Sequence, residues 1–185
     1  MDDFSSLASE RVRPLIRVRQ IRDVSDRPIA PAELDAIADV ARWSGSSQNT
    51  QPWRFILIRQ RGTIRLLAES ARPQTRALLS ATAAIAVVLP ERSGRAVSHA
   101  YDEGRAAERI LIAASMLGLG AGITWILPDA RARIHSILAI PEGEFVRTIV
   151  AIGHPSESAS KPKSAPGTAR MPRNEVIFEE RWPKG

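Results

Sequence analysis

Residues 44–53 read Ser-Gly-Ser-Ser-Gln-Asn-Thr-Gln-Pro-Trp, and an alternating, β-prone stretch continues to Ile58. The pattern predicts a polar loop that leads into a strand over residues 53–58. Hydroxyl and amide groups at this density are costly to bury unless each is hydrogen-bonded. Such a loop suits a planar ligand rich in heteroatoms, because its side chains donate to carbonyl oxygens and accept from ring N–H groups. A solvated turn is the alternative interpretation.

Around this loop, apolar periodicity predicts a chain of mixed α and β structure without internal repeats. Further strands are expected over residues 83–89, 121–127 and 146–153. Helices are expected over residues 9–20, 31–41, 63–71, 74–81, 102–118 and 129–138. Pro31 suits the first turn of its helix, and Asp129 is a plausible N-cap of another.

The composition indicates one globular domain. The chain has 185 residues, of which 44% are hydrophobic, and it contains no cysteine, which excludes disulfides and a cysteine nucleophile. The apolar stretch from Ile110 to Leu127 is interrupted by small and polar residues, so we expect no membrane span. The first residues, Met1 to Phe4, are acidic and lack an apolar run, which argues against a secretory signal. We therefore expect a cytoplasmic protein.

The net charge of +6 raises the possibility of nucleic-acid binding. The arginines are scattered, however, and aromatic residues make up only 5% of the chain, too few for base stacking. One cluster is more specific. Arg17, Arg19 and Arg22, with Gln20, are spaced so that they can converge on one phosphate through charge-assisted bonds. A basic helix face is the alternative.

Three glycines, Gly118, Gly120 and Gly122, follow a helix and precede a strand. A dinucleotide fingerprint needs the opposite order, so a Rossmann site is not expected. The glycines indicate either a corner where the backbone closely approaches a flat object or a simple helix cap. His99, His135 and His154 are isolated from one another, so no metal site is expected either.

The C-terminal part combines an irregular segment, residues 155–172, with an apolar piece, residues 175–182. A structureless stretch of this length is uncommon inside a compact domain. We expect the chain end to dock on a second copy, giving a homodimer with an exchanged arm. A flexible linker followed by an intramolecular strand is the alternative.

Together these residues resemble the FMN-dependent nitroreductase family. The family begins with a pattern like R-R-S-x-R-x-F, and Arg19–Val24 stands in its place. The motif A-P-S-x-x-N-x-Q-P-W is similar to residues 44–53, and a long helix ending in G-L-G is matched at Gly118–Gly120. A strand ending in G-x-P is matched at Gly153–Pro155, and a late R-K-P pattern at Arg170–Pro172. The sequence departs from the pattern at Val18, Gln20 and Gly45, where the family usually has arginine, serine and proline.

The resemblance implies an α+β fold with a mainly antiparallel sheet and an intertwined homodimer. Residues 1–155 would form the FMN-binding core and residues 156–185 an extension that wraps the partner. FMN would lie at the dimer interface. The resemblance assigns cofactor contacts to Arg17, Arg19, Gln20, Arg22, Ser46, Ser47, Asn49, Gln51, Gly122, Ile123, Thr124 and Arg170. A backbone N–H within residues 122–125, up to Trp125, would face flavin N5.

The resemblance also implies an activity. NAD(P)H would pass hydride through FMN to a small acceptor such as a quinone or a nitroaromatic compound, by ping-pong exchange at one site. No side-chain acid or base is required, since the flavin carries the chemistry. Three other functions stay open on the sequence: dehalogenation or flavin fragmentation within the same superfamily, non-catalytic flavin binding, and nucleic-acid binding.

Overall fold

An antiparallel sheet of four strands lies at the centre of the computed structural model, which describes residues 7–161, 164 and 170–183. Its strands follow the order β1-β2-β4-β3. They comprise β1 (Arg54–Ile58), β2 (Ala83–Pro90), β3 (Gly120–Trp125) and β4 (Glu144–Gly153). The expected α+β class with an antiparallel sheet is therefore confirmed.

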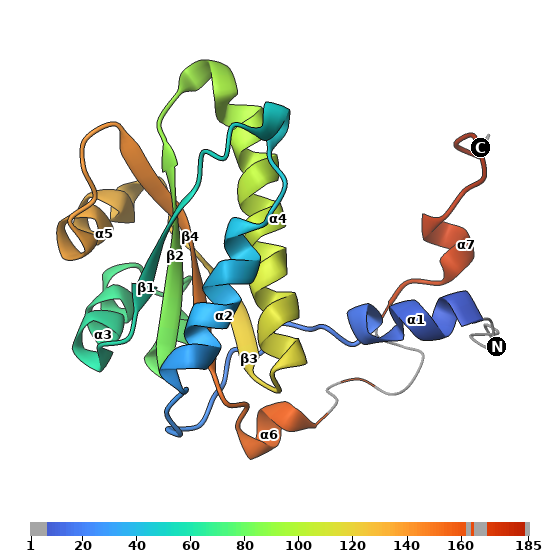
Figure 1. Ribbon diagram of the computed structural model, residues 1–185, viewed down its shortest axis with the longest axis horizontal. Helices are drawn as coiled ribbons and strands as arrows, with labels where there is room; N and C mark the ends of the chain where they lie inside the picture. Colours follow the sequence, from blue (N-terminus) through green and yellow to red (C-terminus); the bar gives the residue numbers. More distant parts are fainter. Residues whose placement is uncertain (1–6, 162–163, 165–169, 184–185) are drawn as a thin grey trace.

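Helices cover both faces of the sheet, as Figure 1 shows. One face carries α2 (Pro31–Arg42) and α4 (Ala96–Met116), and the other carries α3 (Arg61–Ser70) and α5 (Arg131–Leu138). Short 3-10 turns connect these elements: η1 (Ser47–Asn49), η2 (Arg76–Leu79), η3 (Ser93–Arg95) and η4 (Pro128–Ala130). The remaining helices are α1 (Leu7–Ile16), α6 (Glu157–Ser160) and α7 (Arg173–Val176).

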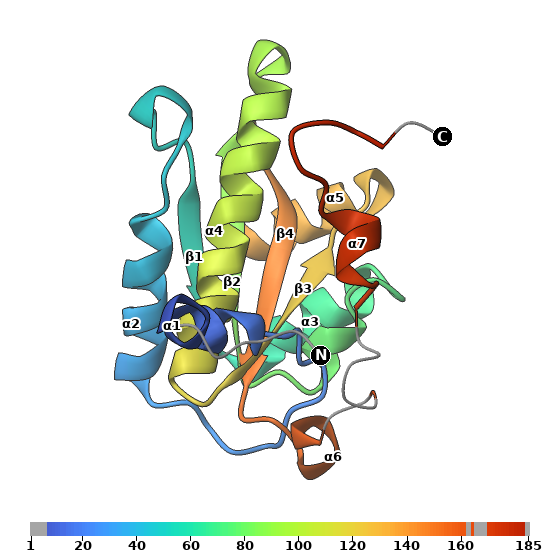
Figure 2. The ribbon, with the colours of Figure 1, turned by 90° about the vertical axis from the view of Figure 1, so that its right-hand side faces the viewer.

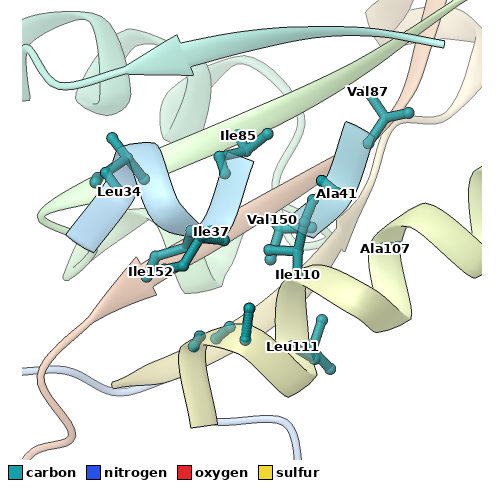
Figure 3. Packing of buried hydrophobic residues seen from close by; sticks show 14 of the residues in the cluster. Leu34, Ile37, Ala41, Ile85, Val87, Ala107, Ile110, Leu111, Val150 and Ile152 are labelled. Carbon is teal, nitrogen blue, oxygen red and sulfur yellow. The ribbon is translucent and has the colours of Figure 1, made fainter. Parts of the chain in front are cut away.

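The buried strand β2 explains why the core has two halves. Side chains alternate along a strand, so Ile85 and Val87 face α2 and α4, whereas Ala86 and Val88 face α3 and α5. Figure 3 shows the first half, in which Ile37 of α2 and Ile110 of α4 meet β2 and β4. A strand that is covered on both faces needs apolar residues at every position, and residues 83–89 form such a continuous apolar run.

Helices α1 and α7 lie away from the sheet and from the helices that cover it (Figures 1 and 2). None of the ten residues of α1 is buried, and Leu15 and Ile16 are both more than half exposed. In the last described segment, Trp182 is 80% exposed. Among the described residues, none of the helices combines the length and the hydropathy that crossing a bilayer requires.

Two expected helix starts are wrong. The helix predicted from residue 102 begins at Ala96, so Asp102 is an interior helix residue, and its carboxylate accepts a hydrogen bond from the backbone N–H of Ser47. Helix α5 begins at Arg131 with Ala130 in the N-cap position, and the side chain of Asp129 does not cap it. In addition, the helix expected over residues 9–20 ends at Ile16, and only a short 3-10 turn forms within residues 74–81.

Candidate functional site

The segment that carries Arg19, Gln20 and Arg22 lies against the free edge of β3. The backbone N–H of Ile21 donates to the carbonyl oxygen of Ala121 at 2.8 Å. Farther along, Val24 forms an isolated bridge with Pro155, just beyond the end of β4. The arginine-bearing segment thus continues the sheet beyond its last strand.

Glycines in β3 and β4 make this close approach possible. A Cβ at Gly122 would lie 2.8 Å from the carbonyl oxygen of Ile21, and one at Gly153 would lie 2.5 Å from a methyl carbon of Val24. Gly118 has a different role. It adopts φ +71° after α4, and the N–H of Leu119 donates back to Ala114 at 2.8 Å, as in a Schellman cap. Gly118 is therefore a helix cap, whereas Gly120 and Gly122 admit the chain's own Ile21, through its side chain at Gly120 and its carbonyl oxygen at Gly122, rather than a flat object.

Gln20 and Arg22 are placed together, whereas Arg19 points elsewhere. The guanidinium of Arg22 donates to Oε1 of Gln20 at 3.0 Å. Arg19 donates to the carbonyl oxygen of Ala159, in α6. Arg17 follows directly after α1 and Arg170 opens the last described segment; both are exposed. Arg19 and Arg22 therefore donate to different acceptors.

Within residues 122–125, the edge of β3 directs the backbone N–H groups of Ile123 and Trp125 away from β4. Ile126 donates its N–H to the carbonyl oxygen of Arg147, and antiparallel pairing alternates, so the N–H groups of Gly122 and Thr124 also face β4. Ile123 faces outward, but its N–H donates to Oε1 of Gln20 at 3.2 Å. Among residues 122–125, this leaves Trp125 as the residue whose N–H faces outward without a backbone or side-chain acceptor in the described part of the chain.

The polar loop of residues 44–53 is tied together by its own side chains. Oγ of Ser46 accepts the backbone N–H of Gln51 at 2.9 Å, and Oδ1 of Asn49 accepts from the side-chain amide of Gln51 at 3.3 Å. Gln48, Asn49 and Gln51 all have positive φ angles near +50°. Asparagine is enriched in this left-handed region, whereas glutamine adopts it uncommonly. The loop is therefore an ordered scaffold with exposed amides rather than a simple turn.

A buried carboxylate that the sequence did not reveal anchors this loop. Asp102 of α4 is 1% exposed and accepts the backbone N–H of Ser47 with both oxygens, at 3.0 and 3.2 Å. Its neighbour Arg105 lies 3.9 Å away and packs under Gly45, where a Cβ would come within 2.0 Å of the guanidinium. A side chain at position 45 would therefore require the exposed guanidinium of Arg105 to move. The i, i+3 spacing of Asp102 and Arg105 on one helix is the sequence signal that could have suggested the pair.

Within one chain the two parts of the expected site lie at opposite ends of α4. Ser47 is bonded to Asp102 near the start of this helix, whereas the segment around Ile21 contacts β3, which follows its end. From Asp102 to Met116 the helix advances about 21 Å at about 1.5 Å per residue. Ser46, Ser47, Asn49 and Gln51 are therefore not brought to Arg19, Gln20 and Arg22 in a single chain.

Comparison with known proteins identifies the family. The family model described as "Nitroreductase family" matches residues 17–154. The chain belongs to the nitroreductase family. An Archaeoglobus fulgidus protein that bears the provisional name NADH dehydrogenase/NAD(P)H nitroreductase is 32% identical over 146 residues, covering 75% of this chain and 82% of that protein.

Solved structures agree on the nitroreductase fold. An FMN-dependent nitroreductase from Clostridium difficile superposes with a TM-score of 0.76 at 22% identity, covering 91% of this chain and 98% of the other. Nitroreductase A from Vibrio parahaemolyticus superposes with a TM-score of 0.76 at 20% identity, covering 94% of this chain and 76% of the other. The resemblance noted in the sequence is confirmed.

Proposed function

We propose that this nitroreductase-family chain is an FMN-dependent NAD(P)H oxidoreductase that reduces a small electrophile, such as a quinone or a nitroaromatic compound. The observation that carries the proposal is the separation of the two half-sites along α4. One copy offers the arginine segment and the edge of β3, and a second copy would supply the loop around Ser47. The proposal therefore includes a homodimer in which each cofactor is held by both chains.

The donors on the described residues fit the two ends of FMN. Guanidinium groups bind phosphate through charge-assisted and often bidentate bonds, and Arg17, Arg19 and Arg22 lie on or beside one exposed segment. The outward N–H of Trp125 can donate to a ring nitrogen, and Ser46 and Asn49 of the partner would add hydroxyl and amide groups. Arg170 would reach the phosphate from the C-terminal extension, residues 156–185, which we propose wraps the partner.

When bound, FMN supplies hydride transfer through N5 between NAD(P)H and the acceptor. The chain's own task is to bind the cofactor, to exclude water and to stabilise negative charge at the ring edge with fixed donors. The N–H of Trp125 is the donor that the β3 edge directs there. Oε1 of Gln20 accepts the N–H of the neighbouring Ile123 at 3.2 Å, and this hydrogen bond holds the edge of β3 in place. Reductant and acceptor would occupy the same place in turn, as ping-pong exchange requires.

The test uses the purified full-length protein. We expect a yellow complex after addition of FMN, weaker binding of riboflavin, which lacks the phosphate, and anaerobic bleaching by NADH or NADPH. Reoxidation by a quinone should follow, with parallel lines in initial-rate plots. Failure to bind FMN would refute the assignment of FMN as the cofactor. Bleaching without reoxidation by any acceptor would favour a flavin-binding protein, and a benzimidazole product in air would favour flavin fragmentation.

A further inference from the structure

A cavity of about 270 Å³ lies at the far end of β4 from the arginine segment. Its walls come from the end of β2, the start of β4, the first turns of α4 and the first residue of α5. We call it the arginine pocket and define it by Arg92, Arg131, Arg147, His99 and Phe145. Arg147 and Gly153 are separated by about 20 Å along β4, at about 3.3 Å per residue. The pocket is therefore distinct from the half-site around Arg19 and Arg22.

A β-bulge aims Arg147 into this pocket. Val87 pairs with Thr148 and Val88 pairs with Val146, so Arg147 is an extra residue in the ladder. Strict alternation would turn its side chain toward α3 and α5, whereas it instead reaches Glu103 of α4. Bulges re-aim side chains in this way and are often found beside binding sites.

The guanidinium groups of the pocket are arranged around one aromatic ring. The Cζ atoms of Arg131 and Arg147 lie 5.5 and 5.6 Å from the ring centroid of Phe145. These cation–π contacts hold the two guanidinium groups in place beside the cavity. Arg92 lines the same cavity from the segment that precedes α4.

Three arginines and one glutamate, Glu91, line the pocket, and Glu103 pairs with Arg147, so the arginines exceed these two carboxylates by one charge. Glu103, 3% exposed, pairs with Arg147 through one oxygen, and its other oxygen has no described partner. Arg92 and Arg131 form no ion pair with any described residue, and the buried Nε of Arg131 has no hydrogen-bond acceptor there. Glu91 lines the cavity without an ion pair in the described part of the chain, and Glu144, next to Phe145, has a buried oxygen without a hydrogen-bond partner there. Like charges around one cavity repel, and a bound anion relieves that repulsion.

We propose that the arginine pocket binds a small oxyanion, the carboxylate or phosphate group of a small molecule. Guanidinium groups present planar forks of donors that match these groups. The cavity is smaller than typical pockets for drug-sized ligands, which limits the occupant to a compact molecule. The apolar surfaces of Phe145, Pro90 and Ala96 favour a carboxylate attached to a small ring or chain over a bare ion. The site does not depend on the proposed cofactor.

The test is calorimetric titration of the full-length protein with benzoate and with inorganic phosphate, at constant ionic strength. We expect saturable binding that falls about tenfold or more in Arg131→Gln and in Arg92→Gln, because one charge-assisted bond is worth at least about 1.4 kcal/mol. Both positions lack ion pairs in the described part of the chain, so folding should survive. Arg147→Gln is avoided, since it would leave Glu103 buried without its partner.

Arg19→Gln is the matched control, because it removes the same charge from the other arginine cluster. It should leave benzoate binding unchanged. The probe whose binding Arg131→Gln weakens and Arg19→Gln does not identifies the oxyanion of the pocket as carboxylate or phosphate. Absence of saturable binding of either probe, or equal weakening by Arg19→Gln and Arg131→Gln, would overturn the proposal.

Discussion

Replacing Gly122 with alanine would place a methyl carbon 2.8 Å from the carbonyl oxygen of Ile21 and 3.0 Å from Cγ of Arg22. The oxygen belongs to backbone that is itself fastened to β3 by the Ile21–Ala121 hydrogen bond. Rotation of a side chain cannot relieve this contact. The arginine segment must therefore shift away from the sheet edge.

The structure predicts that alanine substitutions at three glycines change the free energy of unfolding by different amounts. Overpacking of this kind costs about 1–3 kcal/mol, and Gly122→Ala should fall in that range. Gly120→Ala should cost less, because its new Cβ would meet only side-chain carbons of Ile21, at 2.7 and 2.9 Å. Gly62 in α3 has nothing within 4 Å, so alanine there should be neutral or stabilising by up to about 1 kcal/mol.

The assay is urea unfolding of the three variants, with thermal unfolding as a second measure. For a chain of this size about 1 kcal/mol corresponds to about 2–4 °C, so Gly122→Ala should unfold about 2–12 °C below the wild type. Its FMN affinity should fall as well, because Gln20 and Arg22 flank the displaced carbonyl. If Gly122→Ala and Gly62→Ala unfold at the same urea concentration, the close approach of the arginine segment to β3 is wrong.

Three further predictions concern the cofactor, the loop and the dimer. Arg19→Ala and Arg170→Ala should each weaken FMN binding by about 1.5–3 kcal/mol, measured by quenching of flavin fluorescence, with Arg65→Ala as control; unchanged dissociation constants in both would refute the phosphate assignment. Asp102→Ala should cost about 1.5–3 kcal/mol by removing a charged acceptor from the Ser47 N–H, and should speed hydrogen exchange at that amide, whereas unaltered exchange would contradict the anchor. Truncation before Lys161 should abolish the dimer in sedimentation velocity, and a truncated chain that still dimerises would argue against the exchanged arm.

The strands and the polar loop could be predicted from the sequence because their signals are local. The apolar run of β2 and the alternation in β1 depend only on which residues follow one another. Helix α4 shows the limit of this reasoning. The sequence predicts a helix that begins at residue 102, whereas the helix begins at Ala96 and the carboxylate of Asp102 accepts from Ser47, which is 55 residues away.

The sequence alone determined the family, the order of the elements and the residue types of the candidate site. Tertiary structure decided which groups meet: that Gly122 admits the chain's own backbone, that the N–H of Trp125 faces outward, and that a bulge turns Arg147 toward α4. It also separated the loop from the arginine segment along α4. The physical reason is that propensity and periodicity act over a few neighbouring residues. Register, close approach and charge balance arise only when distant segments pack together.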